Sequence, residues 1–442
     1  MRIPHNLKNQ QAGGVLVITL LVTGVIGFSM ASYLKLAQAT VMANSRSADW
    51  NTALPMMEAG VEDALAHLNK NDTNYVRDGW QLSYGSYVVK RELRDSYYQV
   101  SIVATNKLKP VIEATGYALQ RSGHGRGANA AKYVSRKVRV FAERQPKFKK
   151  GMVTKGNIDL SGNNIATDSF DSGDPLFNTG GKYDPAKKKD KGDIATNASI
   201  INSLAVGNAN IMGTIATGPG GVPAIGANGT VGNKAWVTSG KIGIMPGAFT
   251  DDMNVAFPDV EVPIGPWLPA PIGGVVGGVM YDRIITTGNW IFSGSTALSG
   301  KVLITGNATV LVTSSIGFSG SGKLTIATNA SLKLYADCAS ATISGGGVVN
   351  AAGNALNFQY FGTPKNTSVS ISGNGTLTGV VYAPNADFTL VGGGGAGSAT
   401  DFSGASMTKS VKMAGHFNFH FDENLLRNGA SEGYTVTAWN EI

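Results

Sequence analysis

Residues Val15–Leu34 read VLVITLLVTGVIGFSMASYL, and this stretch decides how the rest of the chain is organised. It contains no charged residue, and eleven of its twenty residues are Val, Leu, Ile or Phe. Twenty residues of α-helix rise roughly 30 Å, which is the thickness of the hydrocarbon core of a bilayer. The stretch therefore predicts a membrane-spanning helix.

The charges in front of this stretch predict its orientation. Arg2 and Lys8 precede the apolar run. Positively charged residues stay on the cytoplasmic side of a membrane. We therefore expect a single-pass protein of the inner membrane or cell envelope, with its N-terminus in the cytoplasm and the rest of the chain outside.

A cleavable secretory signal is an alternative interpretation of the same stretch. Ala37-Gln38-Ala39 fits the small-x-small pattern of a signal cleavage site, and cleavage there would give a chain that begins at Thr40. The apolar run is longer than the usual signal core, and Lys35 lies between the run and the site. These two features favour the anchor.

The helical pattern continues well past the apolar stretch, so that we expect one helical region over residues 14–70. Val61, Leu65 and Leu68 recur at the spacing of one helix face. Pro55 is expected to kink or divide the helix, because proline removes a backbone hydrogen bond. The first half of such a helical region is apolar and lies in the membrane. Its second half is amphipathic and lies outside the membrane.

Two short motifs in this region resemble those of a known family. Gln10–Val17 resembles the end of the leader and the cleavage glycine of type IV pilins. Together with Ala43–Arg46 and Met57–Leu65, it is similar to the N-terminal segment of PilX-type pilus assembly proteins, which are minor pilins. The resemblance covers residues 8–68.

The resemblance implies how the chain is processed and with what it assembles. Residues 1–13 would be a leader peptide, removed by cleavage after Gly13 or Gly14, and the helix would then pack with other pilins in a fibre or in the assembly machinery. The second motif places Glu58 in the pilin-like helix. With a cut after Gly13, the fifth mature position, where major pilins carry Glu, is Ile18 here. This departure is compatible with a minor or atypical pilin.

The composition predicts a protein that is mainly β outside the helix. The 442 residues include 58 Gly, and only 15% are charged, which fits a chain with many turns. Cys338 is the sole cysteine, which excludes an intramolecular disulfide and a multi-cysteine zinc site.

Residues 75–145 predict a small domain with a helix packed on an antiparallel sheet. Four β-branched and aromatic runs supply the strands: 85–93, 96–104, 111–118 and 133–141. In the last run, Val134, Val138 and Val140 are expected to face the core. A helix on a four-stranded meander is also the layout of the pilin globular domain.

The positive charge of the protein gathers in this middle region. Residues 70–155 hold 18 Lys and Arg against 6 Asp and Glu, whereas the whole chain has a net charge of +8. A cluster of basic side chains could neutralise phosphates: Arg121, Arg126, Lys132, Arg136, Lys137 and Arg139. A solvated face explains the cluster equally well, and we do not expect DNA as a partner.

The character of the sequence changes after a linker at residues 146–155. Segments with a turn Asn followed by an alternating strand recur at 307–312, 329–334, 366–371 and 385–390, with neighbouring copies 22 and 19 residues apart. Short strands with Gly-rich corners at such spacing predict a parallel β-helix, or solenoid, over residues 156–430. A β-sandwich is the alternative fold. We expect the proline-rich stretch 244–285 to cross the face of the domain, and residues 431–442 to be a C-terminal tail.

Few residues in the large domain are candidates for chemistry. Asp168 and Asp171 form a carboxylate cluster with Asp174, but the spacing lacks the Asp-x-Asp-x-Asp-Gly calcium loop, so we interpret them as turn residues with calcium as the alternative. His416 and His420 would share one face of a strand, where a metal is the alternative to a solvated final coil.

These features together predict a structural protein rather than an enzyme. No catalytic residue, metal or cofactor is expected, and the function is display of a β-domain at the cell surface, in a pilus or a type II secretion-like assembly, or for adhesion. The membrane and extracellular glycans or surfaces are further candidate partners. The competing class is a β-helix enzyme that acts on polysaccharides, which would need paired carboxylates on the outer face.

Overall fold

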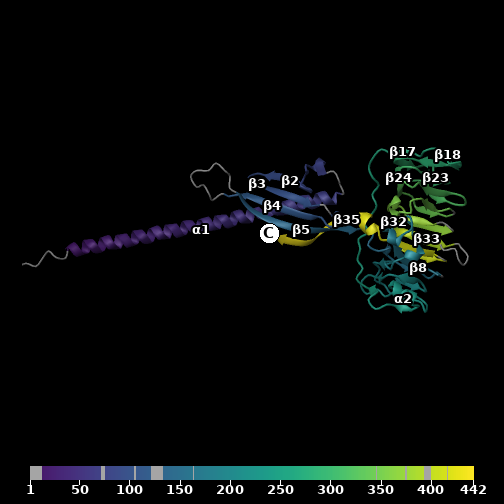
Figure 1. The fold of residues 1–442 in the computed structure, drawn as a ribbon, viewed down its shortest axis with the longest axis horizontal. Helices are drawn as coiled ribbons and strands as arrows, with labels where there is room; N and C mark the ends of the chain where they lie inside the picture. Colours follow the sequence, from purple (N-terminus) through teal and green to yellow (C-terminus); the bar gives the residue numbers. More distant parts are fainter. Residues whose placement is uncertain are drawn as a thin grey trace, which may run out of the picture. The chain divides into compact units, whose positions relative to one another are not determined.

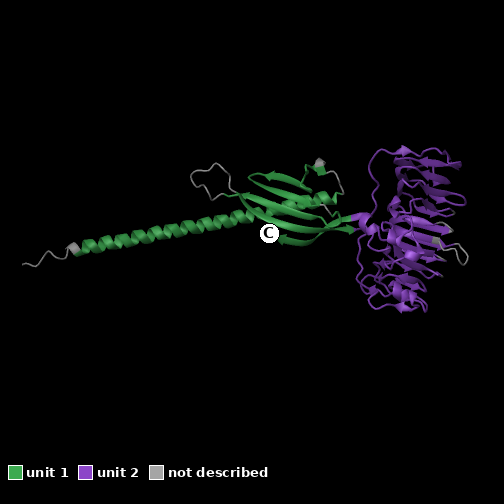
Figure 2. Cartoon of the chain, in the orientation of Figure 1, with its two compact units in different colours: residues 1–145, 432–442 green, residues 146–431 purple. Residues whose placement is uncertain are grey.

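The computed structural model describes residues 12–70, 75–103, 106–120, 133–162, 164–344, 346–373, 376–392, 400–415 and 417–442. The chain divides into two compact units (Figure 2). Unit 1 comprises residues 1–145 and 432–442, and unit 2 comprises residues 146–431.

Unit 1 is built from one long helix and an antiparallel sheet (Figure 1). Its strands have the order β1-β2-β3-β4-β5-β35. The elements are α1 (Ala12–Asn69), the 3₁₀ helix η1 (Tyr75–Asp78), β1 (Gln81–Ser83), β2 (Ser86–Leu93), β3 (Ser96–Val103), β4 (Val111–Leu119), β5 (Tyr133–Pro146) and β35 (Ser431–Glu441).

Helix α1 has an exposed apolar half and a packed half. The half that begins at Gly14 is apolar and exposed, and it extends beyond the sheet (Figure 1). By length and composition it can cross a membrane, which fits a membrane anchor or a signal sequence. The helix runs through Pro55 without a break, so the expected division there is wrong.

The packed half of α1 holds the sheet through an apolar stripe. Met57, Val61, Ala64 and Leu68 are buried at the spacing of one helix face. Each of the larger of these side chains contributes roughly 1.5–3 kcal/mol by leaving water. The facing sheet residues are Val100, Ile102, Ile112, Val138 and Val140.

A glycine on β4 allows the helix to approach the sheet closely. A Cβ atom at Gly116 would lie 2.3 Å from the carbonyl oxygen of Ala53 and 2.4 Å from the backbone nitrogen of Met57. Polar contacts then fasten the two layers: Arg91 Nε lies 2.7 Å from Asp63 Oδ2, and the Tyr98 hydroxyl donates to the same atom.

The four strands expected in the middle domain are present, but the sheet is larger than the sequence indicates. Val138 and Val140 are buried as expected, and Val134 is half-buried. The expected tail is instead an edge strand, β35. Glu441 accepts two hydrogen bonds from Arg136 on β5, and Gln145 donates to Thr435, so that the last residues close the edge of the sheet.

Unit 2 contains a large sheet of short strands, and we describe it in two halves. The first half holds β6 (Met152–Thr154), β7 (Ile158–Asp159), β8 (Ala166–Phe170), η2 (Pro175–Phe177), η3 (Pro185–Lys187), β9 (Ile194–Thr196), β10 (Leu204–Gly207), β11 (Asn210–Met212), β12 (Ile215–Ala216), β13 (Ala224–Ile225), β14 (Thr230–Gly232), α2 (Lys234–Thr238), β15 (Gly243–Ile244) and β16 (Phe249–Thr250).

The second half is longer and more regular. It holds β17 (Leu268–Pro269), β18 (Gly274–Val276), β19 (Val279–Tyr281), β20 (Arg283–Ile285), β21 (Gly288–Phe292), β22 (Leu298–Ser299), β23 (Lys301–Ile304), β24 (Asn307–Val312), β25 (Ile316–Phe318), β26 (Lys323–Ile326), β27 (Ser331–Ala336), β28 (Ser340–Ile343), β29 (Val348–Asn350), η4 (Ala355–Asn357), β30 (Phe358–Gly362), β31 (Ser368–Gly373), β32 (Leu377–Gly392), β33 (Thr400–Ala414), β34 (Phe417–Asp422) and α3 (Leu425–Asn428).

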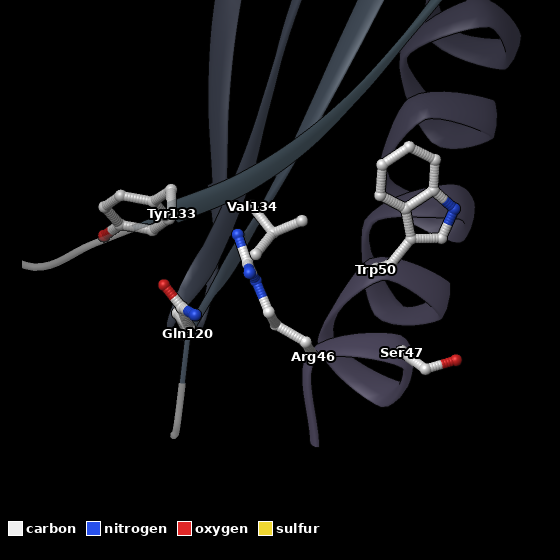
Figure 3. Close-up of a pocket in the computed structure, with 6 residues that line it drawn as sticks. All are labelled: Arg46, Ser47, Trp50, Gln120, Tyr133 and Val134. Carbon is white, nitrogen blue, oxygen red and sulfur yellow. The ribbon is translucent and has the colours of Figure 1, made fainter. Parts of the chain in front are cut away.

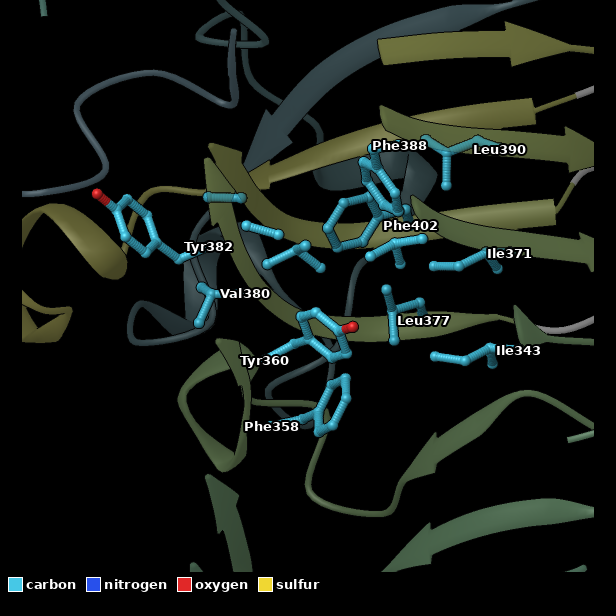
Figure 4. Packing of buried hydrophobic residues seen from close by; sticks show 14 of the residues in the cluster. Ile343, Phe358, Tyr360, Ile371, Leu377, Val380, Tyr382, Phe388, Leu390 and Phe402 are labelled. Atoms are coloured by element: carbon cyan, nitrogen blue, oxygen red, sulfur yellow. The ribbon is translucent and has the colours of Figure 1, made fainter. Parts of the chain in front are cut away.

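Strands in the second half pair in parallel with the third strand that follows. This rule gives three rows: β20-β23-β26-β29, β21-β24-β27-β30 and β22-β25-β28-β31. Each row continues into the long strand β32. Buried side chains line the inside of the rows, as Figure 4 shows for Ile343, Ile371 and Leu390.

The register corrects one of the two expected spacings. Asn307 pairs with Ser331, so the repeat there is 24 residues rather than 22. Ser368 pairs with Asp387, which is the expected offset of 19 residues. The two pairs belong to different rows, because β24 and β27 lie in one row and β31 in another.

The first strands of unit 2 pair with its last strands. β33 pairs with β6 and β7, and β34 pairs with β8. The expected linker 146–155 is therefore part of unit 2: Phe148 is buried and β6 begins at Met152. The first and the last strands of unit 2 therefore lie side by side, in the middle of its sheet.

Residues 251–267, which we name the crossing segment, lead from β16 to β17 and contain no regular helix or strand. The Asn197 side chain bonds both backbone groups of Val255, at 2.6 and 3.0 Å. The Tyr382 hydroxyl donates to the carbonyl oxygen of Pro258 at 2.6 Å. Asn197 follows β9 in the first half of unit 2 and Tyr382 lies on β32 in the second half, so the segment contacts both halves.

Candidate functional site

A buried polar cluster lies where the last strand of unit 2 meets one of its first strands. His420 on β34 pairs in register with Asp168 on β8. The phenylalanines of β34 point into the core, so that His420 and Asp422 point to the other face. That face is covered by the chain that follows β8, whose Tyr183 ring stacks on His420 at a centroid distance of 3.5 Å.

Three carboxylate and aromatic groups surround the His420 ring. Its Nδ1 atom lies 2.5 Å from Asp168 Oδ1, and its Nε2 atom lies 3.5 Å from Asp401 Oδ1. The Tyr183 hydroxyl donates to Asp168 Oδ2 at 2.7 Å. His420 is 3% exposed and Asp168 is 4% exposed, so these two side chains are shielded from water, whereas the Asp401 side chain is 39% exposed.

Burial and charge act in opposite directions on His420. Burial lowers its pKa, but the neighbouring carboxylates of Asp168 and Asp401 outweigh burial, so the pKa of His420 is raised above its ordinary value. Burial, with the charge of Asp168, also raises the pKa of the Tyr183 hydroxyl. The geometry therefore favours an imidazolium that is held between carboxylates.

A second group of ion pairs continues the cluster toward α3. Arg427 Nη2 lies 2.6 and 2.8 Å from the two carboxylate oxygens of Asp171. Lys189 Nζ lies 2.6 Å from Glu423 Oε2. Asp422 accepts from the backbone and the hydroxyl of Ser172, while burial raises the pKa of its carboxyl.

The three aspartates that the sequence predicts as turn residues, Asp168, Asp171 and Asp174, differ in what they contact. Asp174 does cap a short 3₁₀ helix, and Asp171 accepts from the backbone of Gly173. Asp168, by contrast, is not a turn residue, since it lies within β8 and bonds His420. Within the described ranges, no group of three or more His, Cys, Asp or Glu side chains could hold a metal ion.

The other sequence-predicted residues are spread over the chain. Gly14 and Ile18 lie in the exposed half of α1, and Gly13 lies near its start. Glu58 is exposed on the packed half. His416 is outside the described residues. The sequence analysis missed Tyr183, because no pattern connects it with His420 and only the fold brings the two together.

Part of the basic cluster in unit 1 is neutralised within the sheet. Arg136 pairs with Glu441, and Lys137 and Arg139 both pair with Glu113. These pairs reduce the charge that the cluster offers to a phosphate chain. Arg121, Arg126 and Lys132 lie outside the described residues.

One pocket of unit 1 lies between α1 and the ends of β4 and β5. It has a volume of about 520 Å³ and is lined by Arg46, Ser47, Trp50, Gln120, Tyr133 and Val134 (Figure 3). Trp50 and Tyr133 are both exposed. Among the lining residues that the structure describes, Arg46 is the one charged group, so these residues offer no set of acid and base groups.

Comparison with known proteins finds one family. Residues 274–428 match the family model described as a domain of unknown function, DUF7305, which covers most of the second half of unit 2. No curated protein matches the chain. No solved structure matches it.

Proposed function

We propose that this chain is a structural, cell-surface protein of the minor-pilin type, anchored in the membrane by α1, which displays unit 2 outside the cell. The observation that carries the proposal is the division of α1 into an apolar half without buried residues and a half that packs on the sheet of unit 1. Such a helix can span a bilayer, or pack against other helices, without disturbing the fold of unit 1. Other pilins, the assembly machinery and the membrane are its proposed partners.

We further propose that unit 2 is a β-solenoid. The three rows of parallel strands support this fold, because a chain that returns to each row after every third strand winds in coils. Side chains such as Val310, Leu334 and Tyr360 follow one another in register inside one row and are buried. Antiparallel pairing, which a β-sandwich uses, occurs in unit 2 between β18 and β19.

The candidate site supports a structural rather than a catalytic role. Asp168 bonds His420 and Tyr183, and Asp171 bonds Arg427, so these carboxylates already have partners. A polysaccharide hydrolase or lyase needs carboxylates that reach its substrate. The cluster instead joins the first and last strands of unit 2.

N-terminal sequencing of the chain extracted from membranes tests the proposed processing. A pilin-type protein begins at Gly14 or Val15, whereas a secreted one begins at Thr40. Replacing Gly13 and Gly14 together with leucine should leave the leader attached. The matched control, Ala37→Arg with Ala39→Arg, removes the alternative signal site and should not change the N-terminus.

Processing at the secretory signal site instead of the pilin-type site would contradict the proposal. If the arginine variant alone accumulates unprocessed and the wild-type chain begins at Thr40, the protein is secreted without an anchor. An enzyme remains the second candidate class for such a secreted protein.

A further inference from the structure

One face of unit 2 carries short polar side chains in a regular array. The outward residues of four successive parallel strands form this hydroxyl face: Ser340 and Thr342 on β28, Ser368 and Ser370 on β31, Asp387 and Thr389 on β32, and Ser410 and Lys412 on β33. Each pair is two residues apart on its strand, and the register aligns the pairs from strand to strand.

The hydrophobic core lies directly beneath the array. The residues between the paired positions, Ala341, Val369, Phe388 and Val411, are each at most 2% exposed. They point inward with Ile343, Ile371 and Leu390, which are labelled in Figure 4. Hydroxyls on such strands stand about 4.8 Å apart across the sheet and about 6.7 Å apart along each strand.

Five of the six hydroxyls of this face take no part in the hydrogen bonds of the described residues, and the sixth, that of Ser410, donates to Asp387. In the described part of the chain, the side chains of Ser340, Thr342, Ser368, Ser370 and Thr389 have no protein hydrogen-bond partner, and Ser340, Thr342 and Ser368 are exposed. Each hydroxyl can donate one hydrogen bond and accept others. The face therefore offers donors and acceptors at fixed positions.

The charges of the face indicate the kind of partner. The β28 and β31 positions are uncharged. Asp387 on β32 is balanced by Lys409, whose Nζ lies 3.0 Å from Asp387 Oδ2, and it also accepts from Ser410 at 2.6 Å. Lys412 on β33 is exposed and has no ion-pair partner among the described residues, so the face is neutral over β28, β31 and β32 and positive at its β33 edge. The neutral part complements a neutral partner that is rich in hydroxyls. It does not complement an acidic polymer.

We propose that the hydroxyl face binds the surface of an ordered, insoluble, neutral polysaccharide. This inference rests on the proposed display function, because it names what the displayed unit contacts. When a hydroxyl exchanges a hydrogen bond with water for one with a sugar, the binding free energy gained is small. A rigid polymer that is already ordered forms many such bonds at once with little loss of conformational entropy, whereas a soluble oligosaccharide forms few and loses its own freedom.

Cosedimentation of the full-length chain in detergent with microcrystalline cellulose tests the inference. The variant Thr342→Val/Ser370→Ala/Thr389→Val removes three hydroxyls with little change of shape. It should bind about ten-fold or more weakly, because three hydrogen bonds are lost. Ser370→Lys places a long side chain on the face and should weaken binding as well. The control Thr309→Val/Thr325→Val removes hydroxyls from β24 and β26 in the other two rows and should bind as the wild type does.

Three results would overturn the inference: no wild-type binding to cellulose, equal binding of the triple variant, or binding to polygalacturonate alone. Soluble cellohexaose should compete poorly, and strong competition would also contradict it. The N-terminus of the same preparation separates the two proposals. A chain that begins at Gly14 or Val15 but does not bind cellulose contradicts only this inference.

Discussion

His420 Nδ1 lies 2.5 Å from Asp168 Oδ1, although the two residues are 252 positions apart in the chain. This contact joins β34 to β8, so it holds the end of unit 2 to its beginning. Both side chains are buried, and Tyr183 covers the ring. The contact between His420 and Asp168 therefore stabilises the pairing of the last strand of unit 2 with one of its first strands.

Replacing Asp168 with alanine should destabilise unit 2 by about 3 kcal/mol or more, because His420 and the Tyr183 hydroxyl lose a buried partner. Hydrogen–deuterium exchange of peptides from β8 and β34, with and without urea, measures this. Asp174→Ala, which removes a cap from a short 3₁₀ helix, is the control and should cost about 1 kcal/mol. Equal effects of the two variants would show that the His420 contact adds little.

The same contact predicts a dependence of stability on pH. The pKa of His420 is raised in the folded state, so its contribution to stability is complete below the unfolded pKa, about 6.5, and is lost as the pH rises through the folded pKa. The urea midpoint of unit 2 should therefore fall as the pH is raised above about 6.5. In the His420→Gln variant this fall should shrink, and an unchanged pH profile would assign the dependence to other groups.

Gly116→Val should separate α1 from β4. The Cβ atom would lie 2.3 Å from the carbonyl oxygen of Ala53, which is backbone and cannot rotate away. We expect a loss of about 3 kcal/mol in the stability of unit 1, at the upper end of overpacking effects. Hydrogen–deuterium exchange of peptides from β4 and from the packed half of α1 reports the loss, since these segments share the core of unit 1. Gly24→Val, where no atom lies within 4 Å, is the matched control.

Deletion of residues 432–442 should destabilise unit 1 and leave unit 2 unchanged. The deletion removes β35, the Arg136–Glu441 pair and the Tyr434 side chain, which packs against the core of unit 1. Hydrogen–deuterium exchange of the backbone amides should become faster in β5 and stay the same in β27 and β30. If the exchange of β5 does not change, residues 432–442 behave as the tail that the sequence predicts.

Asn197→Ala should release the crossing segment. It removes both hydrogen bonds to Val255, for a cost of about 1–2 kcal/mol. Limited proteolysis should then cut faster within residues 251–260. Asn329→Ala, at an exposed turn, is the control. Equal cutting of both variants would mean that Tyr382 and the apolar contacts hold the segment without Asn197.

The sequence by itself determined the features that depend on neighbouring residues. The uncharged run Val15–Leu34 predicts a long apolar helix, and α1 contains one. Runs of β-branched and aromatic residues predict β2, β3 and β4 to within one residue at each end, and the start of β5, because such runs favour strands locally. The last five residues of β5, up to Pro146, are not predicted. The turn Asn of 366 and 385 likewise predicts the offset at which β31 pairs with β32.

Only the tertiary structure decided how distant segments meet. The pairing of β33 with β6, the use of residues 431–441 as an edge strand, and the contact of His420 with Asp168 and Tyr183 all join residues that are far apart in the chain. No local pattern encodes such partners, because each strand edge accepts any strand whose backbone is extended. Register, burial and the packing of the core select among them, and these exist only once the chain has folded.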